Sequence, residues 1–298
     1  MAAPTIRKAY ADSPLGQIHY RYTAPSPTSI KSNPEKLPIL FLHMSASSSA
    51  IFEQLMTVYT SLGHACYAPD MPGFGASFDP PSSSSSLSSL DSPSSIKWYI
   101  DLYVATFFES GAFPSLSRGC HVLGHHSGGV IGVEFAVSHP EHVKSLAVIG
   151  PVLMDLAQRR AAAQSTRAFN EPSPDGTHLA KTWEYLQSHG GITTATAAEM
   201  ALLQRETLDH ARAWRGRLQI YKCVFADEAD GPALYKQVRC PLIAMCARDD
   251  VLWSGFGRMA EIRPDVEAVE VGGANFTPGR DPEGVERHYT PFLKRLDV

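Results

Sequence analysis

The sequence has no excess of basic residues. Its 26 lysines and arginines are outnumbered by 30 aspartates and glutamates, so the formal net charge at pH 7 is −4. Binding to nucleic acid or to an acidic membrane surface requires clustered Lys and Arg side chains, and the sequence contains no such cluster. We therefore expect a small-molecule substrate, with no nucleic acid and no membrane as partner, and leave a homodimer open.

Long apolar runs are also missing. A membrane-spanning helix needs about 20 consecutive, mostly apolar residues, and no run close to that length occurs in the 298 residues. The N-terminal stretch 1–8 lacks the apolar core of a secretory signal. The sequence therefore predicts a cytoplasmic protein.

Cysteines are few, odd in number and irregularly spaced. Several lie within apolar, strand-like runs, as buried thiols do. The five are Cys66, Cys120, Cys223, Cys240 and Cys246. An odd set without regular spacing does not predict a disulfide framework, so we expect reduced thiols in a reducing, intracellular compartment.

Apolar content of 44% and charged content of 19% are ordinary for a globular protein with a sizeable core. Short apolar runs alternate with longer amphipathic ones, which predicts an α/β fold with a mostly parallel sheet and helices on both faces. The expected strands are 18–23, 38–43, 65–69, 120–124, 144–149, 241–246 and 266–271. The expected helices include 96–108, 127–138 and 282–293.

Two segments interrupt this pattern. Residues 151–238 read as helices with little strand pattern, which predicts an inserted helical cap and a core made of 1–150 and 239–298. Residues 80–95 are dominated by serine, with the run Ser82–Ser86. Such a composition cannot bury a core, so we expect a mobile surface loop there.

Five short motifs occur in the order and spacing of a known superfamily. They are Leu42-His43, Asp70–Gly75, Val122–Gly129, Ala247–Asp250 and the stretch Gly272–Glu283. In this the chain resembles the α/β-hydrolase superfamily over nearly all its length outside the cap and the serine-rich loop. The resemblance implies the fold but says little about the reaction, because this fold supports many chemistries.

The resemblance implies a nucleophile on a strained turn between a strand and a helix, in the pattern G-x-S-x-G. If Ser127 held that position, the bulky His125 would crowd the turn. If His126 holds it, Gly124 and Gly128 flank it as the pattern requires. Histidine is among the few residues that tolerate the positive φ of such a turn, so we predict His126 at the elbow and a structural role for His125.

The other triad positions follow from the same resemblance. Asp250 matches the acid, whereas Asn275 stands where the family has its histidine. Asparagine cannot act as a general base, and His288 falls within the closing helix. The usual Ser-His-Asp relay therefore cannot be assembled.

An imidazole at the elbow reaches further than a serine hydroxyl. His126 could then bind Asp250 directly, with Asn275 donating to either group, and a carboxylate-paired imidazole is a competent base near neutral pH. The adjacent histidines lack a metal-site spacing and an evident third ligand. We therefore predict no metal and no cofactor.

The substrate-binding groups are less specific. The resemblance implies an oxyanion donor at the Ser127 backbone N–H and a second near Met44 or Ser45. The hydroxyls of Ser45, Ser47 and Ser48 could add donors or could be ordinary loop polarity. Most aromatic side chains of the cap should serve packing, and Trp214 and Tyr221 are our candidates for contact with an apolar substrate. The cap aromatics are Phe169, Trp183, Tyr185, Trp214, Tyr221 and Phe225.

Three functions fit these residues. The first is a non-hydrolytic enzyme in which the His126–Asp250 pair moves a proton next to a carbonyl, by aldol or retro-aldol chemistry, cyclisation, isomerisation or elimination. The second is an esterase, lactonase or other hydrolase that uses Ser127 or activated water. The third is a ligand-binding protein without catalysis. Because an inactive site need not keep its acid, Asp250 favours the first two, and the sequence analysis prefers the first.

Overall fold

The computed structural model describes residues 4–25, 36–81, 92–166 and 171–296. The serine run Ser82–Ser86 and Phe169 therefore lie outside the described residues, and the expectations for them stay untested. In the described part of the chain, no helix combines the length and the apolar character that crossing a membrane requires.

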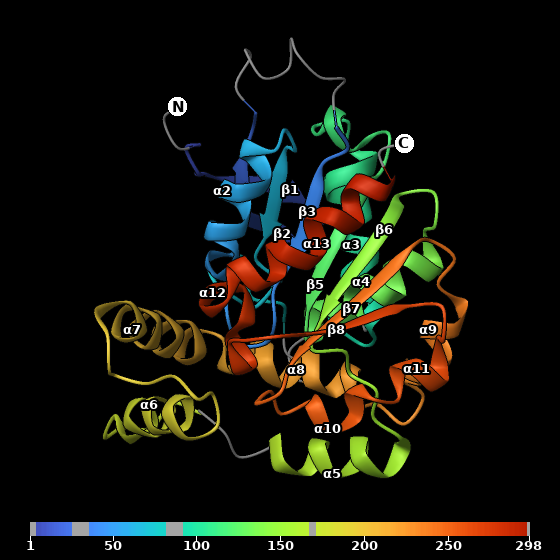
Figure 1. Cartoon of the computed structure of the whole chain (residues 1–298). Coiled ribbons are helices and arrows are strands. Elements are labelled where there is room, and N and C mark those ends of the chain that lie inside the picture. Colours follow the sequence, from blue (N-terminus) through green and yellow to red (C-terminus); the bar gives the residue numbers. More distant parts are fainter. Residues whose placement is uncertain (1–3, 26–35, 82–91, 167–170, 297–298) are drawn as a thin grey trace.

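The centre of the molecule is an eight-stranded, mostly parallel sheet with the order β1-β2-β4-β3-β5-β6-β7-β8 (Figure 1). Only the pairs β1–β2 and β2–β4 are antiparallel. The strands are β1 (Arg7–Ser13), β2 (Gly16–Thr23), β3 (Ile39–Leu42), β4 (Cys66–Pro69), β5 (Cys120–His125), β6 (Val143–Ile149), β7 (Leu242–Ala247) and β8 (Glu267–Val271). The predicted α/β fold is confirmed, and β1 is the one strand that the sequence analysis did not expect.

Helices cover both faces of the sheet because the inner strands are apolar on both sides. Along β3, Leu40 and Leu42 pack into one hydrophobic cluster, whereas Ile39 and Phe41 pack into another on the opposite face. One face carries α3 (Ile96–Tyr103), α4 (Ser127–Ser138) and α9 (Gly231–Gln237), and the other carries α2 (Glu53–Ser61) and α13 (Pro282–Leu296). The helix expected at 96–108 continues beyond α3 as a π-helical segment, Val104–Glu109.

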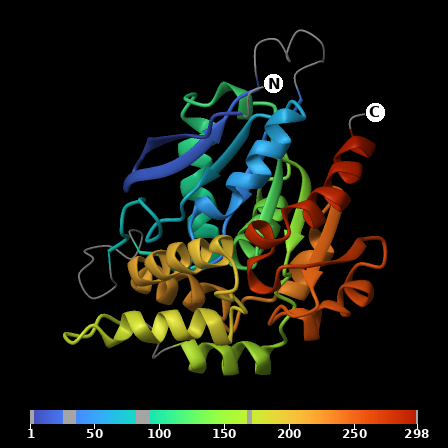
Figure 2. The same ribbon diagram turned by 60° about the vertical axis from the view of Figure 1, so that its left-hand side comes forward.

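The segment expected as a cap contains only helices among its described residues. They are α5 (Leu156–Thr166), α6 (Thr177–Ser188), α7 (Ala197–Arg212), α8 (Trp214–Val224) and α9. Figures 1 and 2 show α5 to α8 gathered at one end of the sheet. This is the carboxyl end of the parallel strands, since α7 contacts the loop that follows β3. The division into core and cap stays a prediction.

Candidate active site

His126 occupies the turn between β5 and α4. Its backbone has φ 48° and ψ −113°, and α4 begins at the next residue, Ser127. A positive φ costs a residue with a Cβ atom on the order of 1 to 2 kcal/mol, so the turn is strained. His125 is the last residue of the strand.

The flanking glycines explain how the chain makes this turn. A Cβ atom on Gly124 would lie 2.4 Å from the carbonyl oxygen of Gly128, and one on Gly128 would lie 2.1 Å from the carbonyl oxygen of Leu42. Both distances are far below van der Waals contact. The strand, the turn and the first turn of α4 can therefore pack together only with glycine at these two positions.

Asp250 lies in the loop after β7 and reaches the ring of His126. His126 Nε2 and Asp250 Oδ2 are 2.7 Å apart, and the second carboxylate oxygen accepts a hydrogen bond from the Leu252 amide at 2.7 Å. The Asp250 side chain is fully buried and that of His126 is 14% exposed. An ionised carboxylate only accepts hydrogen bonds, so Nε2 donates to Asp250. The ring atom Nδ1 is then left to accept a proton.

His125 is adjacent in sequence but has a different environment. It is completely buried, its ring centroid lies 4.5 Å from that of His126, and neither ring nitrogen has a hydrogen-bond partner among the described residues. Burial, followed by the neighbouring rings of His126 and His43, lowers the pKa of His125 well below its ordinary value. His125 is therefore uncharged at neutral pH and leaves the charge of the site to the His126–Asp250 pair.

Two groups of side chains in the described residues could hold a metal ion. The first is His125, His126 and Asp250, whose potential ligand atoms lie within 4.8 Å of one another, and the second is His139, Glu141 and His142. The sequence predicts no metal because no third ligand is evident beside the two histidines. Folding brings Asp250 to them, so that expectation stays a prediction.

The loop after β3 approaches the start of α4. The backbone N–H of Ser45 donates to Ser127 Oγ at 2.7 Å. This contact occupies one acceptor site of the Ser127 hydroxyl, and the hydroxyl proton stays available for donation to another group. Ser127 is also the first residue of a helix, where backbone N–H groups have no partner within the helix. Ser127 can therefore offer a substrate oxygen two donors, its amide and its hydroxyl.

Other residues of this loop face elsewhere. Ser47 Oγ donates to Glu206 at 3.1 Å and Ser48 Oγ donates to Asp209 at 2.7 Å. Both hydroxyls are thus used by the cap, which corrects the expectation that they could donate to substrate. The Met44 side chain is buried in a hydrophobic cluster, so Met44 can contribute to the site only through its backbone.

Asn275 takes part in the site by fixing the acid loop. Its Oδ1 accepts from the Val251 amide at 2.9 Å, and its Nδ2 donates to the carbonyl of His189 at 3.2 Å. The amide group therefore links the residue after Asp250 to the end of α6. This corrects the expectation that Asn275 donates to His126 or to Asp250.

We expect Asn275→His to lower activity rather than to restore an esterase. The ring cannot reproduce both amide hydrogen bonds in a position that is only 8% exposed, and the loss of two such bonds costs about 1 to 3 kcal/mol in stability. The melting temperature and kcat of the variant would be compared with those of Asn275→Ala, which removes the same bonds without adding bulk. Faster ester hydrolysis by Asn275→His than by the wild type would contradict our assignment.

Of the two candidate substrate aromatics, Tyr221 lines a cavity that the His126–Asp250 pair does not line. The guanidinium of Arg215 lies over the Trp214 ring, with its Cζ atom 4.7 Å from the ring centroid. Tyr221 stacks on Phe225 and lines a cavity of about 550 Å³ against α5, and neither His126 nor Asp250 lines it. The roles proposed for Trp214 and Tyr221 stay predictions.

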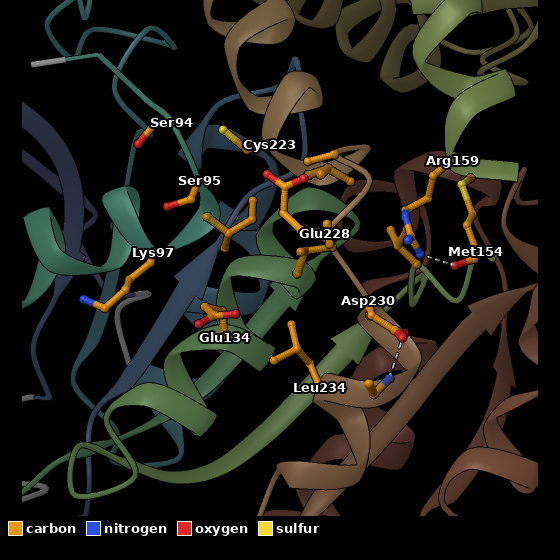
Figure 3. A pocket seen from close by; sticks show the side chains of 18 of the residues that line it. Ser94, Ser95, Lys97, Glu134, Met154, Arg159, Cys223, Glu228, Asp230 and Leu234 are labelled. Carbon is orange, nitrogen blue, oxygen red and sulfur yellow. Dashed lines mark hydrogen bonds between the residues drawn. The ribbon is translucent and has the colours of Figure 1, made fainter. Parts of the chain in front are cut away.

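Sequence reasoning did not identify a second cavity, of about 370 Å³, which also excludes the His126–Asp250 pair. Its walls come from α3, α4 and the segment from α8 to α9 (Figure 3). Val130 on its α4 wall lies four residues after His126. Burial raises the pKa of Glu134, one turn further along α4. No local pattern marks these residues, because the cavity forms between separate elements.

Comparisons with known proteins agree with the observed fold. The model of the alpha/beta hydrolase family matches residues 39–287. A relative from Yersinia enterocolitica, the proposed carbamate hydrolase RutD, is 27% identical over 156 residues, which are 51% of this chain and 54% of that protein. The match thus spans about half of the relative's length.

Solved structures show the same fold over the whole chain. The epoxide hydrolase VrEH1 from Vigna radiata has a TM-score of 0.72 and 16% identity, with 97% of this chain and 98% of that chain covered. A hydrolase from Pseudomonas aeruginosa has a TM-score of 0.71 and 15% identity, with 96% and 98% covered. The chain belongs to the alpha/beta hydrolase family of enzymes.

Proposed function

We propose that this enzyme is a hydrolase in which His126, held by Asp250, activates water. The observation that carries the proposal is the 2.7 Å contact between His126 Nε2 and Asp250 Oδ2 at the nucleophile elbow. The substrate class is an apolar, medium-sized small molecule with an ester, lactone or carbamate carbonyl. Sites for molecules of this kind are lined mainly by apolar and aromatic side chains.

In the first step, water loses a proton to His126 Nδ1 while its oxygen attacks the carbonyl carbon. Asp250 stabilises the imidazolium that forms, because the carboxylate lies against Nε2–H. The negative charge that develops on the carbonyl oxygen is held by the amide and hydroxyl of Ser127. When the tetrahedral intermediate collapses, His126 returns the proton to the leaving group.

Ser127 is a poor candidate for the nucleophile. A serine hydroxyl attacks only when an adjacent base takes its proton. Among the described residues the Ser127 hydroxyl contacts the Ser45 amide, which is a donor and cannot accept a proton. The only carboxylate-paired imidazole of the elbow, His126, is bonded to Asp250. We therefore assign Ser127 to oxyanion binding.

Hydrolysis is supported over the non-hydrolytic reactions that the sequence analysis preferred. The family is that of the α/β-hydrolases, and the relatives named above are described as hydrolases. None of them carries a lyase or cyclase name. The dyad alone could take a proton from carbon or from water, and the family relationship favours water.

The reagent test separates the two hydrolytic mechanisms. If no acyl-serine forms, a fluorophosphonate probe leaves the protein unlabelled and phenylmethanesulfonyl fluoride leaves the hydrolysis rate of p-nitrophenyl esters unchanged. Labelling is measured by intact-protein mass spectrometry, and rapid-mixing kinetics with these esters should show no burst of p-nitrophenol. Stoichiometric labelling of Ser127, or a burst that Ser127→Ala abolishes, would replace activated water with an acyl-enzyme.

A further inference from the structure

Two carboxylates of α7 hold the loop that follows β3. Glu206 and Asp209 lie three residues apart, which places them on the same face of the helix. They accept hydrogen bonds from the hydroxyls of the consecutive residues Ser47 and Ser48. These serines come two and three positions after Ser45, whose amide contacts Ser127. The cap is thus tied directly to the loop that carries a candidate oxyanion group.

The far end of this loop is fixed by the core. The Ser49 amide donates to Asp70 at 2.7 Å, and Arg21 donates to the Ser49 hydroxyl at 2.6 Å. No comparable contact from the sheet fixes Ser47 among the described residues, and its hydroxyl bonds only to Glu206. Together with the burial of Ala46 in the core, α7 therefore holds the loop between Ser45 and Ser49 in position.

Glu206 is an unfavourable group for stability alone. It is completely buried, and burial raises its pKa to about 7. Arg205 contacts Oε1 at 2.9 Å, but Oε2 has no hydrogen-bond partner among the described residues. A buried carboxylate with an unsatisfied oxygen destabilises a fold. Proteins keep such unfavourable buried groups mainly at sites where function requires them.

We infer that Glu206 is a positioning residue: through Ser47 it fixes the loop so that the Ser45 amide aligns the Ser127 hydroxyl with the substrate oxyanion. The inference deepens the proposed function and rests on it for the roles of Ser45 and Ser127. Asp209 supports the same loop through Ser48. The loop is held by the hydrogen bonds described above, and holding it involves no covalent step.

An ionised Glu206 accepts from Ser47 and Arg205 through charge-assisted hydrogen bonds, which are stronger than those of a neutral carboxyl or amide group. Its own helix presents Arg205, Asp209 and His210 to it, and burial lowers the pKa of His210 to about 3, so that His210 is neutral near pH 7. Charged groups from outside α7 act on Asp209 and His210.

Three charges from outside α7 act on the neighbours of Glu206. Arg217 of α8 faces His210, and both Arg21 of β2 and Asp70 face Asp209. Since the pKa of Glu206 is about 7, Glu206 gains a proton when the pH falls below neutrality, and the acidic limb of the kcat profile should include this protonation.

The test compares Glu206→Gln with Glu184→Gln, an exposed glutamate of α6. For p-nitrophenyl ester hydrolysis we expect kcat of Glu206→Gln to fall about tenfold, less than the 10²- to 10³-fold loss for removal of an oxyanion donor, with KM within about twofold. The acidic limb should lose the contribution of the Glu206 proton and depend on one proton fewer than in the wild type. Glu184→Gln should match the wild type in all three quantities.

If Glu206 had a merely structural role, its replacement by glutamine would lower the stability of the fold, whereas a positioning role predicts no such loss. A carboxyl with a raised pKa in the folded state destabilises the fold increasingly as the pH rises from its unfolded value toward about 7. Glu206→Gln removes that penalty, so its Tm at pH 8 should equal or exceed that of the wild type. A Tm several degrees lower would make Glu206 a structural anchor and overturn the inference.

Ser47→Ala provides the second variant. It should lower kcat as much as Glu206→Gln, and the double variant should lose no more than either single one, because the two residues act as a unit. Additive losses, or an unchanged kcat and pH profile in Glu206→Gln, would overturn the inference.

A substrate-free measurement separates this inference from the proposed function. Hydrogen exchange of the amides in 44–48 should be faster in Glu206→Gln than in Glu184→Gln. If the wild type fails to hydrolyse any ester, the proposed function fails and the exchange rates still decide whether Glu206 holds the loop. Equal exchange rates in the two variants would show that it does not.

Discussion

His126→Ala is expected to lower kcat by about 10²- to 10⁴-fold, the range for loss of a single general acid–base group, while the fold stays intact. The His126 ring makes its one described hydrogen bond to Asp250 and is partly exposed. Alanine keeps the strained backbone of the turn, so the change removes chemistry rather than a core contact. Steady-state kinetics and a thermal melt of the same preparation measure both effects.

Asp250→Asn shows whether the two side chains act as one unit. Asparagine keeps the ring in place but removes the charge that stabilises its protonated form, so kcat should fall strongly yet no further than in His126→Ala. The double variant should resemble His126→Ala alone. His288→Ala, in the closing helix α13, is the control and should be fully active. A His126→Ala enzyme with more than about a tenth of wild-type kcat would exclude general-base catalysis by this ring.

Gly150→Ala is expected to abolish activity almost as completely, by steric displacement of the dyad. Gly150 follows β6, and a Cβ atom there would lie 2.2 Å from His126 Cδ2, 2.4 Å from His126 Nε2 and 3.3 Å from Asp250 Oδ2. The backbone cannot move away easily, because the Gly150 amide donates to the carbonyl of Met245 in the neighbouring strand at 2.8 Å. The ring must therefore leave Asp250, and we expect kcat to fall by about 10²-fold or more.

Gly150→Ala also places alanine at φ +62°, which has its own conformational cost. Gly111→Ala is the matched control, because Gly111 has φ +71° and a Cβ atom there would meet nothing within 4 Å. Both variants carry the cost of alanine at a positive φ, on the order of 1 kcal/mol, but only Gly150→Ala should lose activity, together with the stability that the His126–Asp250 contact provides. Near wild-type kcat in Gly150→Ala would mean that the working His126 ring lies elsewhere.

Local patterns in the sequence determined the sheet and the elbow. The apolar runs at 38–43 and 120–124 predicted strands that correspond to β3 and β5, because a strand buried on both faces needs apolar residues at successive positions. Gly124 and Gly128 predicted the turn at His126, since their small size is a requirement of backbone packing within a few residues. Strand hydrophobicity and the size of residues beside a turn depend on positions that are neighbours in the sequence, so they can be predicted without knowledge of the fold.

The strand β1 has no such local signature. Its residues are mostly exposed and alternate weakly, and its place at the edge of the sheet depends on pairing with β2. Similarly, Asn275 matched a family position in sequence, but the partners of its amide, Val251 and His189, come from two different segments. Which of the possible hydrogen bonds a side chain makes depends on distances and angles, and the sequence does not contain these.

Tertiary structure alone decided the contacts of the active site. His126 and Asp250 are 124 positions apart, and the sequence suggested their pairing only by the reach of an imidazole. Ser47 and Glu206 are 159 positions apart, and no sequence pattern connected them. A hydrogen bond forms only when packing brings donor and acceptor to within about 3 Å. The order of residues determined which groups were available, and the packing of the cap against the carboxyl ends of the strands determined which of them met.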